Sequence, residues 1–175
     1  MKTIVFLDFD DVLAIHPDHT SSAVVAALKS KAADQTVELW ENIFNHTAQA
    51  NLRALHNEFA PTIVISSSWA TYLSREQVSD VLSRSGLAFV AESLHENWRS
   101  AIDLGAFRAT EIATWLQQHE HELPFAYVIL DDTSSGKSLF GTPLESHAVF
   151  CTEWTGFVDD RLQAAQKILR VQLAK

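Results

Sequence analysis

The stretch KTIVFLDFDDVL, from Lys2 to Leu13, is the most informative part of the chain. Its first half is apolar on both faces, a pattern typical of a central strand in a parallel sheet. Side chains alternate along a strand, so Asp8 and Asp10 leave on the same side, at the strand's carboxyl end. Two neighbouring carboxylates are costly unless a cation or a proton offsets their charge, which predicts a bound divalent metal. Taken alone, this triplet is equally compatible with a solvated turn, or with a metal site for a nucleotide-sugar diphosphate.

The composition is that of one folded domain covering residues 1–175. Hydrophobic residues make up 47% of the chain, and the mean hydropathy is close to zero. We expect no membrane association, because no apolar stretch is long enough to span a bilayer and no secretory signal is visible. The single cysteine, Cys151, excludes an internal disulfide, and a reducing cytoplasm is the expected location.

The formal net charge of −9 limits the partners of the chain. A chain this acidic is not expected to have an extended basic surface that binds the phosphate backbone of a nucleic acid. It can still act on a phosphorylated substrate where a metal and a few basic groups converge.

Strands alternate with helices along the chain, which predicts a parallel α/β sheet of about five strands with right-handed crossovers. After the first strand, the expected strands cover about 62–65, 87–90, 126–130 and 147–151, and the expected helices about 21–31, 36–59, 75–85, 109–123 and 158–173. The segment 36–59 is either one long helix or two joined at a kink. Residues 91–107 show no clear pattern. The stretch 14–35 is a small insertion, which predicts an open site with little or no cap domain.

Three of these strands end in chemically useful groups, and a basic residue precedes the fourth. The groups are Asp8 and Asp10, Ser66 and Ser67, Asp131 and Asp132, with Arg108 as the basic residue. Parallel strands bring their carboxyl ends to one edge of the sheet, so these distant residues can share one cleft. Carboxylates for a metal, hydroxyls for phosphoryl oxygens and a guanidinium for the remaining charge together predict a phosphoryl-transfer site.

In these motifs the chain resembles the haloacid dehalogenase-like (HAD) superfamily of phosphohydrolases. LDFDDVL matches the first motif of that superfamily, Ser66 in TIVISSSW the second, Arg108 the third, and the acidic pair in YVILDD the fourth. The combination of SSW, a basic residue before EIATWL and ILDD looks like a branch associated with RNA-repair proteins. The resemblance implies a Rossmann-like three-layer sandwich with a central parallel sheet.

The resemblance also implies a reaction, the Mg²⁺-dependent hydrolysis of a phosphomonoester. Asp8 would be the nucleophile that forms an aspartyl-phosphate, and Asp10 would be the general acid and base. The metal ligands would be Asp8, Asp10 through its carbonyl, Asp131 and, through water, Asp132. Ser66, Ser67 and Arg108 would hold the phosphoryl oxygens of the substrate, a small molecule or a nucleic-acid end. The expected assembly is a monomer or a dimer.

Some positions leave alternatives open. Asp11 stands where the superfamily usually has glycine, and Arg99 is the second candidate for the basic role. His16 and His19 could line the entrance, although solvated loop histidines are the more common case. Trp69 and Trp98 could stack a base, but tryptophans in an α/β domain mostly pack in the core or at its rim. A phosphotransferase of the same fold and a non-catalytic binding module are the alternative functions.

Overall fold

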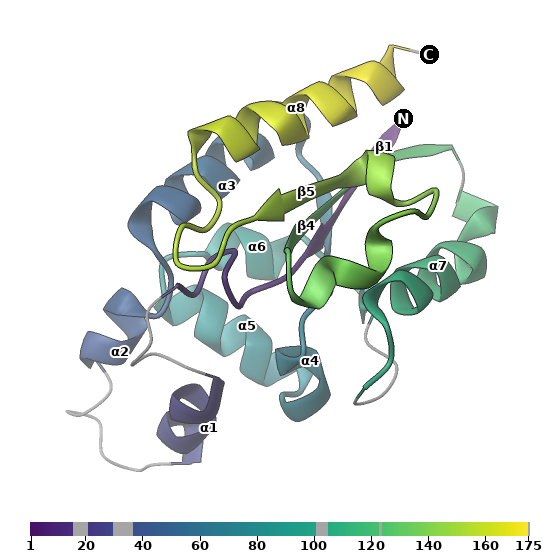
Figure 1. Cartoon of the computed structure of the whole chain (residues 1–175). Helices are drawn as coiled ribbons and strands as arrows, with labels where there is room; N and C mark the ends of the chain where they lie inside the picture. Colours follow the sequence, from purple (N-terminus) through teal and green to yellow (C-terminus); the bar gives the residue numbers. More distant parts are fainter. Residues whose placement is uncertain (16–20, 30–36, 101–104, 123, 175) are drawn as a thin grey trace.

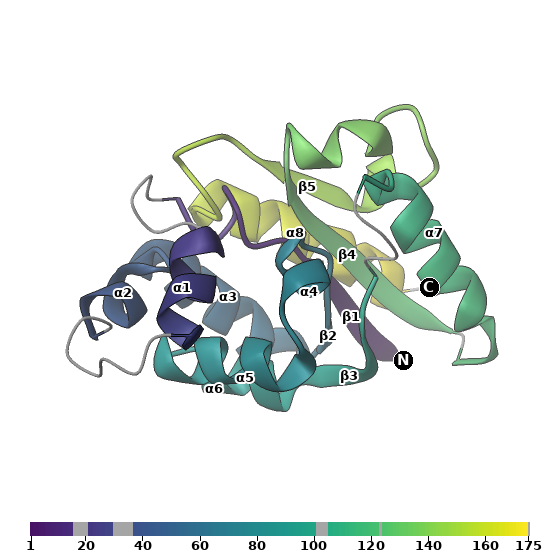
Figure 2. The same cartoon turned by 90° about the horizontal axis from the view of Figure 1, so that it is seen from below.

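The computed structural model describes residues 1–15, 21–29, 37–100, 105–122 and 124–174. Five parallel strands form one sheet in the order β3-β2-β1-β4-β5, as Figure 2 shows. The strands are β1 (Lys2–Leu7), β2 (Thr62–Ile65), β3 (Leu94–Arg99), β4 (Phe125–Asp132) and β5 (Ala148–Cys151). Helices cover the sheet (Figure 1), which confirms the predicted Rossmann-like α/β fold.

The two faces of the sheet are covered unequally. Val5 and Leu7 of β1 belong to the larger apolar cluster, under α3 (His46–Phe59), α5 (Arg75–Arg84) and α8 (Asp159–Leu173). Ile4 and Phe6 point to the smaller cluster, under α7 (Arg108–Gln118) and the 3₁₀ turns η3 (Ser135–Leu139) and η4 (Glu145–His147). Because β1 is buried on both faces, it needs the continuous apolar run seen in the sequence.

The remaining elements are short. They are α1 (Ser21–Lys29), α2 (Val37–Asn42), α4 (Trp69–Tyr72), α6 (Ala88–Glu92) and the 3₁₀ turn η2 (Glu120–Glu122). The segment expected as one or two helices is two, because the side chain of Asn45 caps α3 by accepting from Ala48 N–H. A capping box formed by Ser74 and Gln77 opens α5, within the segment predicted as a helix. Of the predicted insertion, 16–20 and 30–36 lie outside the described residues, and its size stays a prediction.

The strand expected at 87–90 is wrong. These residues enter α6, and the third strand is β3, which follows it. Leu87 and Val90 are fully buried, three positions apart, a spacing that one helical turn also satisfies. The true strand lies at the sheet edge with only Leu94 buried, so no apolar run marks it in the sequence.

None of the helices formed by the described residues is long and apolar enough to cross a membrane. Cys151 is a free, buried cysteine, and burial raises the pKa of its thiol to about 12.

Candidate active site

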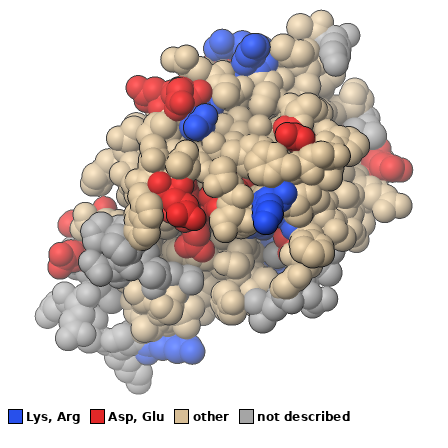
Figure 3. All heavy atoms as spheres, in the orientation of Figure 1, with Lys and Arg blue, Asp and Glu red and all other residues tan. Residues whose placement is uncertain are grey.

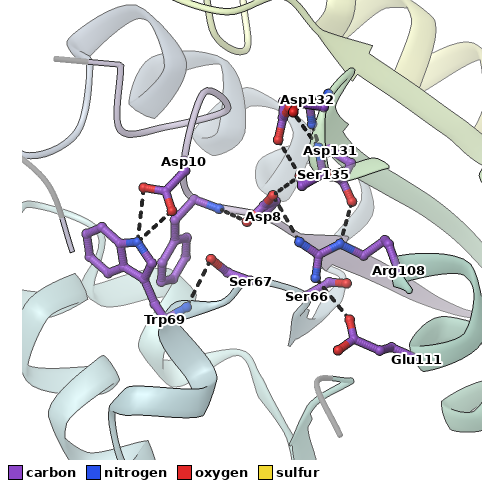
Figure 4. A network of polar contacts seen from close by, with 12 residues as sticks. Asp8, Asp10, Ser66, Ser67, Trp69, Arg108, Glu111, Asp131, Asp132 and Ser135 are labelled. Atoms are coloured by element: carbon purple, nitrogen blue, oxygen red, sulfur yellow. Dashed lines mark hydrogen bonds and ion pairs between the residues drawn. The ribbon is translucent and has the colours of Figure 1, made fainter. Parts of the chain in front are cut away.

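Strand register places three of the predicted groups side by side. Leu7 of β1 pairs with Ile65 of β2 and with Leu130 of β4. The next residues along these strands are Asp8, Ser66 and Asp131, so they lie together at the carboxyl edge (Figure 4). The backbone closes this edge, since Asp8 N–H donates to the Leu130 carbonyl at 3.0 Å and Ser66 N–H to the Leu7 carbonyl at 2.8 Å.

Arg108 is the basic residue that reaches this edge. At the start of α7, its Nη2 lies 3.1 Å from Asp8 Oδ2 and its Nε 2.7 Å from Asp131 Oδ2. Its Nη1 is paired with Glu111 Oε2 at 3.3 Å. Burial lowers the pKa of Arg108, but the surrounding carboxylates raise it by a larger amount. The pKa therefore lies above its usual value, and the guanidinium stays charged. Arg99 lies elsewhere, with Nη1 donating to the Ala70 carbonyl at 2.7 Å.

A serine hydroxyl joins the carboxylates on the other side of Asp8. Ser135 Oγ lies 2.8 Å from Asp8 Oδ2 and 2.6 Å from Asp131 Oδ1, and it also contacts Asp132 Oδ2. A hydroxyl has one proton to donate, so three carboxylate contacts leave negative charge that a further proton or a cation must offset. Burial and the nearby Asp8 accordingly raise the pKa of Asp131 well above its usual value.

The same three carboxylates fit a hard divalent cation. Asp8, Asp131 and Asp132 are buried and offer ligand oxygens that all lie within 4.8 Å of one another. Backbone N–H groups of Ser134 and Ser135 hold Asp132 Oδ1 at 2.6 and 3.0 Å, which orients that carboxylate. An all-oxygen, carboxylate-rich donor set is the one that Mg²⁺ prefers.

The carboxylate of Asp10 points away from this trio. Both of its oxygens accept from Trp69 Nε1 at 3.0 Å, as Figure 4 shows. Burial and the charge of Asp8 raise the pKa of Asp10 to about 6, although the bond from Trp69 lowers it. The indole is fully buried against Phe9 and Phe44, so Trp69 is part of the core and positions Asp10.

The chain was compared with protein families, curated proteins and solved structures. The model of a family described as the HAD domain in Swiss Army Knife RNA repair proteins matches residues 4–162. The chain belongs to this family. It is thus a HAD domain of the phosphoesterase and phosphotransferase type, and the resemblance seen in the sequence is confirmed. No curated protein and no solved structure matches the chain.

Ser66 and Ser67, the serines that follow β2, are fully buried. Ser66 Oγ accepts from Ser100 Oγ at 2.9 Å, and Ser67 Oγ accepts from Trp69 N–H at 3.4 Å. Both lie beside Asp8 and Arg108 in Figure 4. The bonds from Ser100 and Trp69 hold the two hydroxyls in place near the carboxylate of Asp8.

Asp11 adopts the backbone conformation that glycine favours, with φ at 56°. Its carboxylate accepts from Trp154 N–H at 3.1 Å, and Trp154 also has a positive φ of 63°. Asp11 therefore ties the loop after β5 to the loop after β1. His16 and His19 lie outside the described residues.

Sequence reasoning missed Ser135, Glu111 and the role of Trp69. Ser135 follows the acidic pair in DDTSSGKS. The sequence feature that could have identified Ser135 is a serine one turn after the paired aspartates, where the structure begins a 3₁₀ turn. Glu111 stands three residues after Arg108, the spacing of an ion pair within one helix.

Proposed function

We propose that this HAD domain is a Mg²⁺-dependent phosphomonoester hydrolase that forms an aspartyl-phosphate on Asp8. The observation that carries the proposal is the buried Arg108 guanidinium, which bridges Asp8 and Asp131 at the edge where Asp132 and Ser66 also lie. A cation fixed beside a carboxylate nucleophile can hold the oxygens of an incoming phosphoryl group.

Asp8 is the nucleophile in this proposal. Phe9 N–H donates to its Oδ1 at 2.7 Å, while Arg108 and Ser135 contact its Oδ2. These contacts fix the carboxylate for in-line attack on phosphorus, and the leaving oxygen departs on the opposite side. Ser66, Ser67 and Arg108 would bind the phosphoryl oxygens.

Mg²⁺ would be held by the side chains of Asp8, Asp131 and Asp132 and by the carbonyl of Asp10. Bound there, it neutralises the charge of the carboxylates and of the phosphoryl group. Ser135 Oγ contacts all three carboxylates but has only one proton to donate. The remaining negative charge supports a cation at this position.

Asp10 would protonate the leaving oxygen and later take the proton of the attacking water. A carboxyl with a pKa of about 6 is about one-tenth protonated at pH 7, far more than an ordinary aspartate, and a pKa closer to neutral suits a general acid. Asp10 lies two residues after Asp8 on the loop that follows β1, and Trp69 Nε1 donates to its carboxylate at 3.0 Å.

The substrate class follows from the family description, which places such domains in RNA repair proteins. We propose a phosphorylated RNA end, reached in a cytoplasmic setting. On the face drawn in Figure 3, Lys and Arg side chains are scattered and do not form a stripe. Recognition of the terminal phosphate, without tracking of the backbone, suits such a surface.

The test compares phosphate release by the native chain, by Asp8→Asn and by Asp80→Asn, an exposed carboxylate in α5 paired with Arg84. Substrates are p-nitrophenyl phosphate and oligoribonucleotides phosphorylated at the 3′ or the 5′ end, with Mg²⁺ or with EDTA. Asp8→Asn should reduce turnover by at least about 10³-fold, Asp80→Asn should not, and EDTA should abolish it. Unchanged turnover in Asp8→Asn would overturn the proposal.

A further inference from the structure

The edge strand β3 carries a bulge beside the active site. Ile63 and Ile65 of β2 pair with Leu94 and Arg99 of β3. Between these pairs β2 has one residue, while β3 has four, residues 95–98. Bulges of this kind are common next to active sites, where they redirect side chains.

Helix α7 holds the bulge in a fixed shape. Trp115 Nε1 donates to the Asn97 carbonyl at 2.9 Å, and Asn97 Nδ2 lies 2.8 Å from His119 Nε2. The space between the bulge and the helix is therefore preformed, as in most small-molecule sites.

A groove of about 460 Å³ runs between β3 and α7. One end of it adjoins the active site through two buried residues. Ser100 donates to Ser66 at 2.9 Å, and Glu111 is paired with Arg108 at 3.3 Å. From Glu111 to Gln118 the groove follows two turns of α7, about 10 Å, which matches the reach of one nucleoside from its phosphate.

The lining of the groove suits a neutral ring system with hydroxyl groups. It includes Trp98, whose half-buried side chain also packs against the larger apolar cluster, and the uncharged polar residues Thr114 and Gln118. Among the described lining residues Arg99 is the one cation, and it is engaged with the Ala70 carbonyl and lies 5.7 Å from the Trp98 ring. A phosphodiester backbone would find acidic Glu96 and Glu111 here, whereas an indole stacks any nucleobase.

A larger cavity of about 740 Å³ lies along the neighbouring face of α7. Its described lining is mostly apolar, shares only Thr114 with the groove and includes none of the active-site residues. The smaller groove adjoins the active site and the larger cavity does not, so the smaller groove is the better candidate for binding the substrate.

We propose that this groove binds the nucleoside that carries the scissile phosphate, with Trp98 stacking on its base. The inference rests on the proposed phosphatase function, whose substrate it narrows to a nucleotide end with an unpaired terminal base. Ser66 and Arg108 hold the phosphate, and the groove beyond them holds the sugar and the base.

The experiment uses two groove variants and a matched control. Gln118→Trp fills the far end of the groove from an exposed position, and Trp98→Leu removes the stacking ring but keeps an apolar side chain. Gln117→Trp makes the same change at the next residue, which is exposed and lines only the other cavity. Melting temperatures check that each variant folds.

The first readout is selectivity, the ratio of kcat/KM for adenosine 3′- or 5′-monophosphate to kcat/KM for glycerol 2-phosphate, which has no ring. We expect the ratio to fall at least about tenfold in both groove variants, through an increase in KM for the nucleotide, because both changes disturb the binding of the base. The ratio should stay within about twofold in Gln117→Trp. Equal losses on both substrates, or no loss, would overturn the inference.

The second readout separates this inference from the proposed reaction. Equilibrium dialysis measures binding of the radiolabelled adenosine monophosphates with no need for turnover. If the native chain binds them without hydrolysis and the groove variants lose binding, the groove stands and the phosphatase proposal fails. If the native chain does not bind them, or the groove variants bind as it does, the groove proposal fails whether or not phosphate is released.

Discussion

Asp11 shows how one residue can replace the glycine of a motif. A positive φ strains most side chains, but aspartate tolerates it better than most. Here the carboxylate also accepts the N–H of Trp154, a bond that glycine could not form. The sequence left the effect of this replacement open, and the structure gives Asp11 a role in joining two loops.

At this residue we predict a marked difference between two substitutions. Asp11→Ala should lower the free energy of unfolding by about 1–2 kcal/mol, because it loses the acceptor and keeps a strained Cβ. Asp11→Gly should be close to neutral, since relief of strain offsets the lost bond. Urea denaturation measures both, and an alanine variant as stable as the glycine variant would contradict this account.

From the raised pKa of Asp10 we predict that the stability of the metal-free protein depends on pH. Burial and Asp8 raise its pKa from 3.8 to about 6, so the folded chain keeps a proton that the unfolded chain has released. The retained proton stabilises the folded chain fully below about pH 4, and this stabilisation is lost as the pH rises through about 6. The free energy of unfolding should fall by about 2–3 kcal/mol over this range.

Asp10→Asn tests this dependence, because asparagine keeps an acceptor for Trp69 Nε1 and does not titrate. Urea denaturation in EDTA at several pH values between 4 and 7 should show the native chain losing stability relative to the variant as pH rises. Parallel profiles for the two proteins would rule out the expected effect.

At the scale of elements, the strands buried on both faces could be predicted from sequence. Strands β1, β2 and β4 each contain a continuous apolar run that ends in polar groups, and the register of the strands brings those groups together. Helix α6 and strand β3 could not be predicted, because an edge strand with a bulge has no apolar alternation. The contacts of Ser135 likewise depend on how the chain turns after β4, which no short pattern encodes.

The end of α3 offers a prediction at this scale. Ala60 terminates the helix in the left-handed conformation, with φ at 43°, while its N–H donates to the His56 carbonyl. Glycine adopts this conformation without strain, so Ala60→Gly should raise the free energy of unfolding by about 0.5–1 kcal/mol.

The control is Ala50→Gly, at an exposed position inside the same helix. There glycine should lower the free energy of unfolding by about 1 kcal/mol. Two effects of the same sign in thermal or urea denaturation would contradict the explanation.

At the scale of the whole molecule, one sheet edge accounts for the proposed chemistry. Asp8 after β1, Ser66 after β2, Arg108 on α7 and Asp131 on β4 are far apart in the sequence and meet there. The sequence predicted this meeting from strand alternation and identified the superfamily from its motifs. It did not reveal the groove, which depends on packing between an edge bulge and a helix.

The most direct test of the central claim is a search for the phosphoryl group on Asp8. In Asp10→Asn, attack on the substrate should still occur slowly, while hydrolysis of the aspartyl-phosphate lacks its base. The variant is incubated with Mg²⁺ and a phosphorylated substrate, quenched in acid and digested, and its peptides are analysed by mass spectrometry. The account predicts one added phosphoryl group on Asp8 in the peptide that contains LDFN. Steady release of phosphate by the native chain, with no phosphoryl group on Asp8 in the trapped variant, would contradict it.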